Sequence, residues 1–212
     1  MNLKERYYVK CSEVKNKPGT WSSTKVEIFD KEQGDKKIGE YIRNYHGYGE
    51  RTFFPFELNG KHYAVYSKDY TSTRVMTLPD CKDYCGEERD SWGFCPTEYL
   101  VPYSKHYDKY LPFGFISGCV WGDDCSWKIQ LLDFSKLEEG VLRRSAEFGY
   151  IEMLGKHMLE DAIDVEDCFY EIFEEQDEED REDPLVYVTA STAYRLKKDK
   201  DGFYKNPRKE ED

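Results

Sequence analysis

The stretch that decides the fold is Thr52-Phe53-Phe54-Pro55-Phe56-Glu57-Leu58-Asn59-Gly60-Lys61-His62-Tyr63-Ala64-Val65-Tyr66-Ser67. Asn59-Gly60 is the dipeptide that two-residue hairpin turns prefer, because both positions tolerate a positive φ. Such a turn pairs Phe56 with Tyr63 and Glu57 with His62. The register then gathers five apolar residues on one face: Phe54, Phe56, Leu58, Tyr63 and Val65. We predict that this face is core, and that Pro55, which has no N–H to donate, lies in an edge strand or at a bulge.

Outward from the hairpin, short apolar runs separated by turn residues predict further strands. The expected strands cover 7–14, 21–29, 38–45, 74–78, 113–120 and 127–133, with weaker ones at 141–144 and 150–154 and a closing strand at 185–194. Residues 80–112 lack clear periodicity and predict a long irregular excursion. The fold class that follows is mainly β, an antiparallel sandwich or irregular barrel of about ten strands. A few-bladed propeller-like fold is the alternative.

The periodicity changes near the C-terminus. Apolar residues at helical spacing (Val165, Cys168, Phe169, Ile172 and Phe173) predict one amphipathic helix over about 159–176. An acidic loop over 177–184 follows it. We expect a single β-rich domain over 1–196 that includes this helix, and a disordered charged tail over 197–212.

The charge of the chain is concentrated in one segment. The 212 residues carry a net charge of −12. Residues 160–183 hold fourteen Asp or Glu and one Arg, a net charge of −13. The rest of the chain therefore carries a net charge of +1. This acidic segment has three interpretations: a solvated helix face, a docking segment for a basic partner, or a mimic of a nucleic-acid backbone. Direct nucleic-acid binding is not expected of it.

Seven cysteines without an apolar signal sequence indicate reduced thiols and a cytoplasmic protein. No apolar run reaches the length of a membrane span, so no membrane partner is expected. Cys81, Cys85, Cys95 and His106 offer four potential zinc ligands within one stretch, but their spacing matches no familiar zinc module. The sequence therefore leaves metal binding open there and predicts no cofactor.

The segment from Gly118 to Lys128 is the candidate site. Asp123 and Asp124 fall in a predicted turn between two strands, flanked by Trp121 and Trp127. A Gly-Asp-Asp turn needs no ligand to explain it, because Gly and Asp favour turns. Aromatic rings, carboxylates and a lysine also suit a planar or anionic ligand. Trp121, Asp124, Trp127 and Lys128 are the predicted ligand-binding residues.

The sequence contains no catalytic motif, so the leading hypothesis is a non-enzymatic binding protein with an aromatic and acidic site near residues 80–128. Its partner is an unknown small molecule or protein. Two alternatives remain: a small metal-dependent hydrolase that uses Asp123 and Asp124, and an acidic interaction protein or nucleic-acid mimic that acts through 160–183.

Overall fold

The computed structural model describes residues 3–45, 49–86, 94–101, 103–104, 109–120 and 127–144. The chain divides into two compact units, Met1–Tyr99 and Leu100–Asp212. Each unit is described by itself below. The predicted end of the β domain at residue 196 lies outside the described residues.

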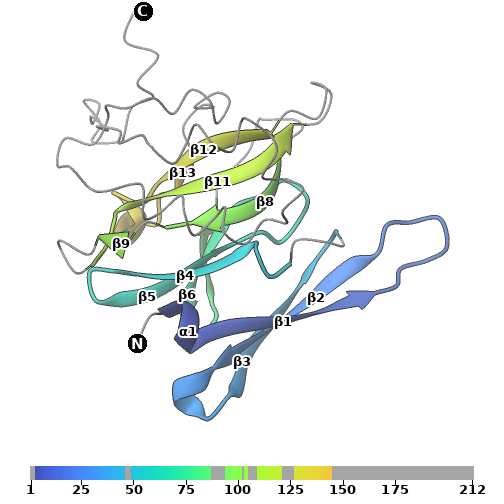
Figure 1. Cartoon of the computed structure of the whole chain (residues 1–212), viewed down its shortest axis with the longest axis horizontal. Helices are drawn as coiled ribbons and strands as arrows, with labels where there is room; N and C mark the ends of the chain where they lie inside the picture. The colour runs from blue at the N-terminus through green and yellow to red at the C-terminus, as the bar shows by residue number, and fades with distance from the viewer. Residues whose placement is uncertain are drawn as a thin grey trace, which may run out of the picture. The chain divides into compact units, whose positions relative to one another are not determined.

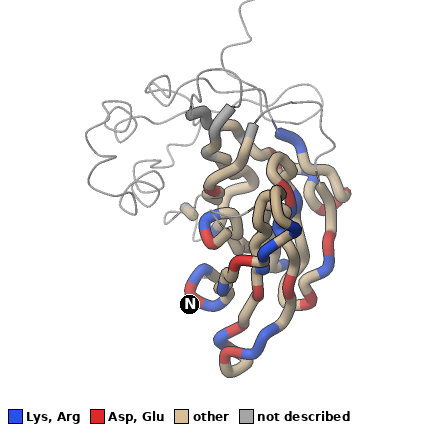
Figure 2. Tube along the Cα trace, turned by 90° about the vertical axis from the view of Figure 1, so that its right-hand side faces the viewer, with Lys and Arg blue, Asp and Glu red and all other residues tan. Residues whose placement is uncertain are grey.

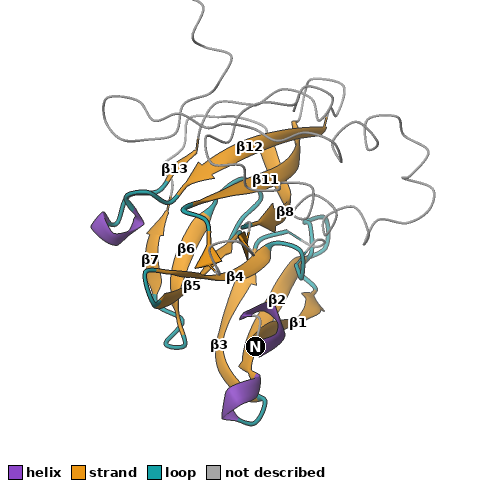
Figure 3. Cartoon of the chain, turned by 60° about the vertical axis from the view of Figure 1, so that its left-hand side comes forward, coloured by secondary structure: helices purple, strands orange, loops and turns teal. Residues whose placement is uncertain are grey.

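The described chain is mainly β, as predicted, and its strand ladders are antiparallel (Figures 1 and 3). The first unit contains α1 (Leu3–Arg6), β1 (Tyr7–Val14), β2 (Ser23–Asp30), η1 (Lys31–Gln33), β3 (Lys36–Arg43), β4 (Phe53–Leu58), β5 (Lys61–Tyr66), β6 (Arg74–Leu78) and β7 (Asp83–Gly86). β8 (Phe94–Leu100) ends this unit. Two sheets form here, with strand orders β1-β2-β3 and β4-β5-β6-β7.

The second unit contains β9 (Tyr103–Ser104), β10 (Lys109–Tyr110), β11 (Phe113–Val120), β12 (Trp127–Asp133), η2 (Leu137–Glu139) and β13 (Arg143–Arg144). β12 lies between β11 and β13, and β9 pairs with β10. Each sheet has a linear strand order, so none closes into a barrel within the described residues. The sandwich stays a prediction.

The predicted hairpin, formed by β4 and β5, is confirmed in register. Phe56 pairs with Tyr63 and Glu57 with His62, around a turn whose residues Asn59 and Gly60 have φ of 52° and 76°. The five residues of the predicted apolar face are all buried. Pro55 lies in β4, an edge strand of its sheet, where its missing N–H costs no ladder hydrogen bond.

Burial of this hairpin extends beyond the predicted face. Phe53, Pro55, Ala64 and Tyr66 point to the opposite side of the two strands and are buried as well. The hairpin is therefore covered on both faces, which an alternating pattern from one strand pair does not reveal.

The two sheets of the first unit touch through their side chains. The Tyr41 ring of β3 packs on the Tyr66 ring of β5, with centroids 4.8 Å apart. Gly39 of β3 lies so close to Cys81, in the turn before β7, that an added Cβ would be 2.6 Å from the Cys81 Cβ. A glycine fits this position because any larger residue would overlap the Cys81 side chain.

The prediction of an irregular excursion over 80–112 is wrong for much of its length. β7, β8, β9 and β10 all fall within it. β7 pairs with β6 through a register shift between Val75 and Met76, and the short strands β9 and β10 hold only two residues each. Bulges and two-residue ladders interrupt the alternation of apolar and polar residues, so periodicity does not detect such strands.

Other predicted elements fall outside the described residues. These are the strands at 150–154 and 185–194, the helix over about 159–176, the acidic loop over 177–184 and the tail over 197–212. β11 and β12 match their predicted bounds, with Phe113 opposite Asp133 and Cys119 opposite Trp127.

Candidate functional site

The structure describes the predicted site between residues 118 and 128 only in part. Trp127 and Lys128 begin β12, opposite Cys119 and Gly118 of β11. Trp121, Asp123 and Asp124 lie in the segment 121–126, outside the described residues. The two strands that flank the predicted turn are confirmed, whereas contacts among the predicted ligand-binding side chains stay a prediction.

The predicted thiol cluster has no metal-binding geometry in the described part of the chain. Cys81, Cys85 and Cys95 are free thiols, and His106 lies outside the described residues. No group of three or more described His, Cys, Asp or Glu side chains is arranged to hold a metal ion.

The electrostatic surroundings of these thiols keep them protonated. Burial, with a smaller contribution from nearby carboxylates, raises the pKa of Cys81 and of Cys85 to about 11. Burial also raises the pKa of Cys95, although the Arg43 guanidinium acts in the opposite direction. The thiolate is the reactive and metal-binding form, so these cysteines are poor nucleophiles at neutral pH.

Three titratable side chains lie in a row between the two sheets of the first unit, linked by one hydrogen bond and one longer contact. The Tyr7 hydroxyl at the start of β1 lies 3.1 Å from Nδ1 of His62 in β5, and the two rings meet edge to face. Nε2 of His62 lies 3.8 Å from a carboxylate oxygen of Glu57 in β4. Burial raises the pKa of Tyr7 to about 12, so the phenol is neutral and acts as a donor or acceptor rather than as a base.

A second polar cluster lies beside these three side chains. The Arg6 guanidinium, 4.7 Å from the centroid of the Tyr7 ring, donates two hydrogen bonds of 3.1 and 3.0 Å to the carboxylate of Asp30. Asp30 is fully buried and also accepts a hydrogen bond from the backbone N–H of Glu32. Burial opposes ionisation of Asp30, but these hydrogen bonds outweigh it and lower the pKa of the carboxyl. The cluster fixes the α1–β1 corner against the end of β2.

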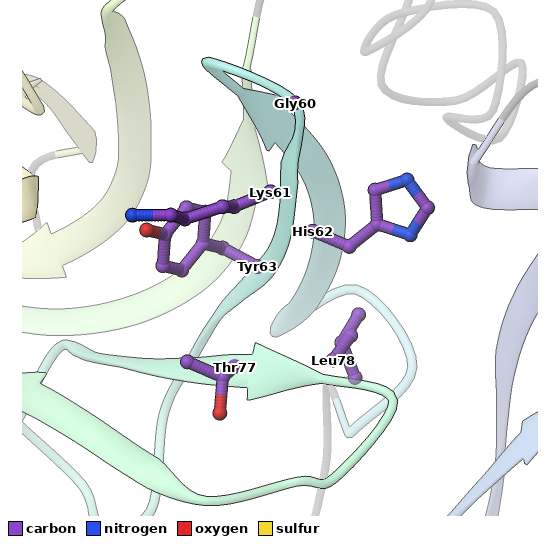
Figure 4. A pocket seen from close by; sticks show the side chains of 6 residues that line it. All are labelled: Gly60, Lys61, His62, Tyr63, Thr77 and Leu78. Carbon is purple, nitrogen blue, oxygen red and sulfur yellow. The ribbon is translucent and has the colours of Figure 1, made fainter.

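An open pocket of about 290 Å³ lies at the tip of the β4–β5 hairpin, next to the end of β6 (Figure 4). It is lined by Gly60, Lys61, His62, Tyr63, Thr77 and Leu78. Lys61 and Tyr63 project to one side of β5, and the His62 imidazole projects to the other. Because His62 is turned towards Tyr7 and Glu57, the pocket does not bring an imidazole together with Lys61 and Tyr63. Small, open pockets with few convergent polar groups are weak candidates for small-molecule sites.

One exposed tryptophan and two half-buried tyrosines, from three separate segments, lie together in the first unit. Trp21, in the loop between β1 and β2, leaves 75% of its surface exposed. Its ring centroid lies 6.4 Å from that of Tyr45, which follows β3, and Tyr45 meets Tyr70 edge to face at 4.8 Å. We call Trp21, Tyr45 and Tyr70 the aromatic row.

Polar contacts hold the aromatic row in place. The Asn16 side-chain amide donates to the backbone carbonyl of Trp21 at 2.5 Å, and the Thr24 hydroxyl donates to the carbonyl of Tyr45 at 3.0 Å. The fully buried Arg43 places its guanidinium 5.4 Å from the centroid of the Tyr45 ring. These bonds hold the backbone at Trp21 and Tyr45, and a buried cation lies beside the Tyr45 ring.

Sequence analysis did not single out the aromatic row. The only local signal is Trp21 itself, a tryptophan two residues beyond the turn residues Pro18 and Gly19. Tyr45 and Tyr70 are 24 and 49 residues further along the chain, so only the tertiary structure brings the three rings together.

Comparison of the chain with protein-family models, with curated proteins and with solved structures gives no match. In the part of the chain that the structure describes, no helix has the length and apolar character to cross a membrane.

Proposed function

We propose that this protein is a non-enzymatic binding protein that receives a ring-bearing ligand or partner on the aromatic row. The exposure of Trp21 is the observation that carries the proposal. A tryptophan is a costly residue to leave in water, and exposed, preordered aromatic side chains are typical anchors of binding surfaces.

The titratable groups of the first unit support binding rather than catalysis. Cys81 and Cys85 are protonated at neutral pH, Tyr7 is neutral, and the carboxylate of Asp30 is paired with the Arg6 guanidinium. Tyr7 and Asp30 both form hydrogen bonds that link separate elements of the unit. This pattern favours a rigid scaffold that presents a surface.

The predicted site at Trp121, Asp124, Trp127 and Lys128 remains part of the proposal as a second contact region, at the turn between β11 and β12. The alternatives, a metal-dependent hydrolase at Asp123 and Asp124 and an acidic interaction protein acting through 160–183, rest on residues outside the described part of the chain. A cytoplasmic location, also proposed, agrees with the free thiols of Cys11, Cys81, Cys85 and Cys95.

The proposal is tested by NMR on the Nε1–H signals of the four tryptophans, with the Trp21 signal identified as the one lost in Trp21→Phe. Three ring-bearing probes are added in turn: cellobiose, adenosine and N-acetyl-tyrosinamide. We expect one of them to shift the Trp21 signal in a saturable way and Tyr70→Ala to weaken that binding about tenfold, since loss of a stacking ring costs roughly 1–1.5 kcal/mol.

Tyr84→Ala serves as the control, because Tyr84 is also an exposed ring but lies on β7, outside the aromatic row. It should leave the affinity unchanged. If none of the three probes moves the Trp21 signal, or if Tyr84→Ala weakens binding as much as Tyr70→Ala does, the aromatic row is not the binding surface.

A further inference from the structure

A second surface, on the outer face of the β1–β2–β3 sheet, holds two lysines over a stacked pair of rings. Tyr8 of β1 is directly opposite Phe29 of β2, and their rings stack with centroids 5.3 Å apart and planes 18° apart. Nζ of Lys10 lies 4.8 Å from the Phe29 centroid and 6.0 Å from the Tyr8 centroid. Nζ of Lys31 lies 5.6 Å from the Tyr8 centroid.

These two ammonium groups differ from other lysines of the same sheet. Lys25 and Lys37 both form ion pairs with Glu27 and Glu40. Lys10 and Lys31 form no ion pair and no hydrogen bond with any described residue, and both side chains are exposed. Their positive charges are therefore held near one ring pair without a compensating carboxylate contact.

The nearby acidic groups are already engaged. Glu27, opposite Lys10 across the strands, binds Lys25 and Lys37. Asp35 accepts a hydrogen bond of 3.0 Å from the Tyr8 hydroxyl, which is a neutral donor. Basic and acidic residues are interspersed along the described part of the chain (Figure 2). Lys36 of β3 also forms no ion pair with a described residue, but it has no cation–π contact, so Lys10 and Lys31 are distinguished by their place beside the two rings.

We propose that Lys10 and Lys31, positioned by Tyr8 and Phe29, form a binding site for a phosphate monoester. Two ammonium groups match the two negative charges that a phosphate monoester carries above its second pKa of about 6. The cation–π contacts restrict the long lysine side chains before the ligand arrives, which lowers the entropic cost of binding. The site is separate from the aromatic row and does not depend on its function.

The test uses the full-length chain labelled with ¹⁵N, at pH 8 and low salt, and two probes of similar shape. Phenyl phosphate is a dianion at this pH, whereas phenyl sulfate is a monoanion. We expect phenyl phosphate to shift the backbone amides of residues 8–10 and 29–31 and to bind at least about fivefold more tightly than phenyl sulfate, because it pairs with both lysines.

Single substitutions locate the site. Lys10→Gln and Lys31→Gln should each raise the Kd for phenyl phosphate about fivefold, the size expected for loss of one exposed charge pair. Lys17→Gln, in the loop between β1 and β2, removes the same charge elsewhere and should change the Kd less than twofold. All three lysines are exposed, so the variants should fold like the parent.

Inorganic phosphate, as a third probe, separates the two contributions to binding. If it shifts the same amides, the phosphate group alone is recognised; if phenyl phosphate is required, the rings contribute, and both results support the site. Absence of shifts at residues 8–10 and 29–31 with phenyl phosphate would overturn the proposal. Equal binding of phenyl sulfate, or an equal effect of Lys17→Gln, would overturn it as well.

Discussion

The Tyr7 hydroxyl lies 3.1 Å from Nδ1 of His62 and so joins the first strand of one sheet to the second strand of another, across 55 residues of sequence. The phenol ring is almost fully buried, and the imidazole is also close to Glu57. In the first unit, this hydrogen bond is a direct polar link between the β1–β2–β3 sheet and the hairpin that decides the fold.

Replacement of Tyr7 by Phe removes this link and leaves the ring in place. We expect Tyr7→Phe to lower the free energy of unfolding by about 1 kcal/mol at pH 7, the usual net value of one buried hydrogen bond. Urea melts measure this loss. If the urea midpoint of Tyr7→Phe equals that of the parent, loss of the hydroxyl has no net cost in stability.

The same variant has a specific signature at high pH. The pKa of Tyr7 is raised from 10 to about 12 in the folded protein, chiefly by burial. Its contribution to stability is therefore complete below pH 10 and is lost as the pH rises towards 12, because the unfolded state releases its proton first. Between pH 10 and 12 the stability of Tyr7→Phe should fall less steeply than that of the parent. If the stability of the two proteins falls equally steeply with pH over this range, Tyr7 does not titrate with a raised pKa.

For the Arg6–Asp30 pair we expect the opposite pH dependence of stability, a loss of stability as the pH falls in the acid range. Arg6→Gln leaves the buried carboxylate of Asp30 with fewer donors, and we expect it to cost roughly 1.5–3 kcal/mol at pH 7. The pKa of Asp30 is lowered in the folded state, so the stability that it provides is present above its unfolded pKa and is lost as the pH falls through the lower folded value.

Thermal melts of Arg6→Gln and the parent at pH 7 and at pH 3 measure this effect. The difference between the two proteins should shrink at pH 3, where Asp30 begins to take up its proton. Lys25→Gln removes two surface ion pairs and should change stability little at either pH value. If the stability difference between Arg6→Gln and the parent is the same at pH 7 and pH 3, the Asp30 carboxylate is not stabilised by Arg6.

Close contact between Gly39 and Cys81 gives a prediction that a second substitution can rescue. Gly39→Ala would place a Cβ 2.6 Å from the Cys81 Cβ and 2.7 Å from its Sγ, and we expect a loss of about 1–3 kcal/mol from this overlap. Cys81 has a φ of 50°, a conformation that glycine adopts without strain. Cys81→Gly should therefore restore much of the lost stability when it is combined with Gly39→Ala. Chemical denaturation of the parent, the two single variants and the double variant measures this. Additive effects of the two substitutions would mean that the two residues do not touch.

The central hairpin gives the largest expected effect. Phe56 is fully buried and stacks on Tyr63 with centroids 5.8 Å apart, so Phe56→Ala should cost about 3–5 kcal/mol in urea melts. Glu57→Gln, at the neighbouring exposed position, should change stability by less than about 0.5 kcal/mol. A loss below about 1 kcal/mol for Phe56→Ala would show that this ring is not part of the core.

The local β structure could be predicted from the sequence wherever turn residues and apolar residues mark a strand and its ends. Asn59-Gly60 specified the turn and, because side chains alternate along a strand, also the pairing of Phe56 with Tyr63. The bounds of β1, β6, β11 and β12 followed from short segments rich in apolar residues between turn residues. Of the strands within 80–112, β7, β9 and β10 escaped prediction because bulged and two-residue ladders have no regular period.

Contacts between residues from distant strands could not be predicted from local sequence patterns. Trp21, Tyr45 and Tyr70 each have an unremarkable local sequence, and the same is true of Tyr7 and His62. Local patterns report which face of a strand is buried, because that depends on neighbours two residues away. They do not report which other sheet covers that face, because that choice depends on the packing of whole sheets against one another. The aromatic row and the polar links of the first unit arise from that packing.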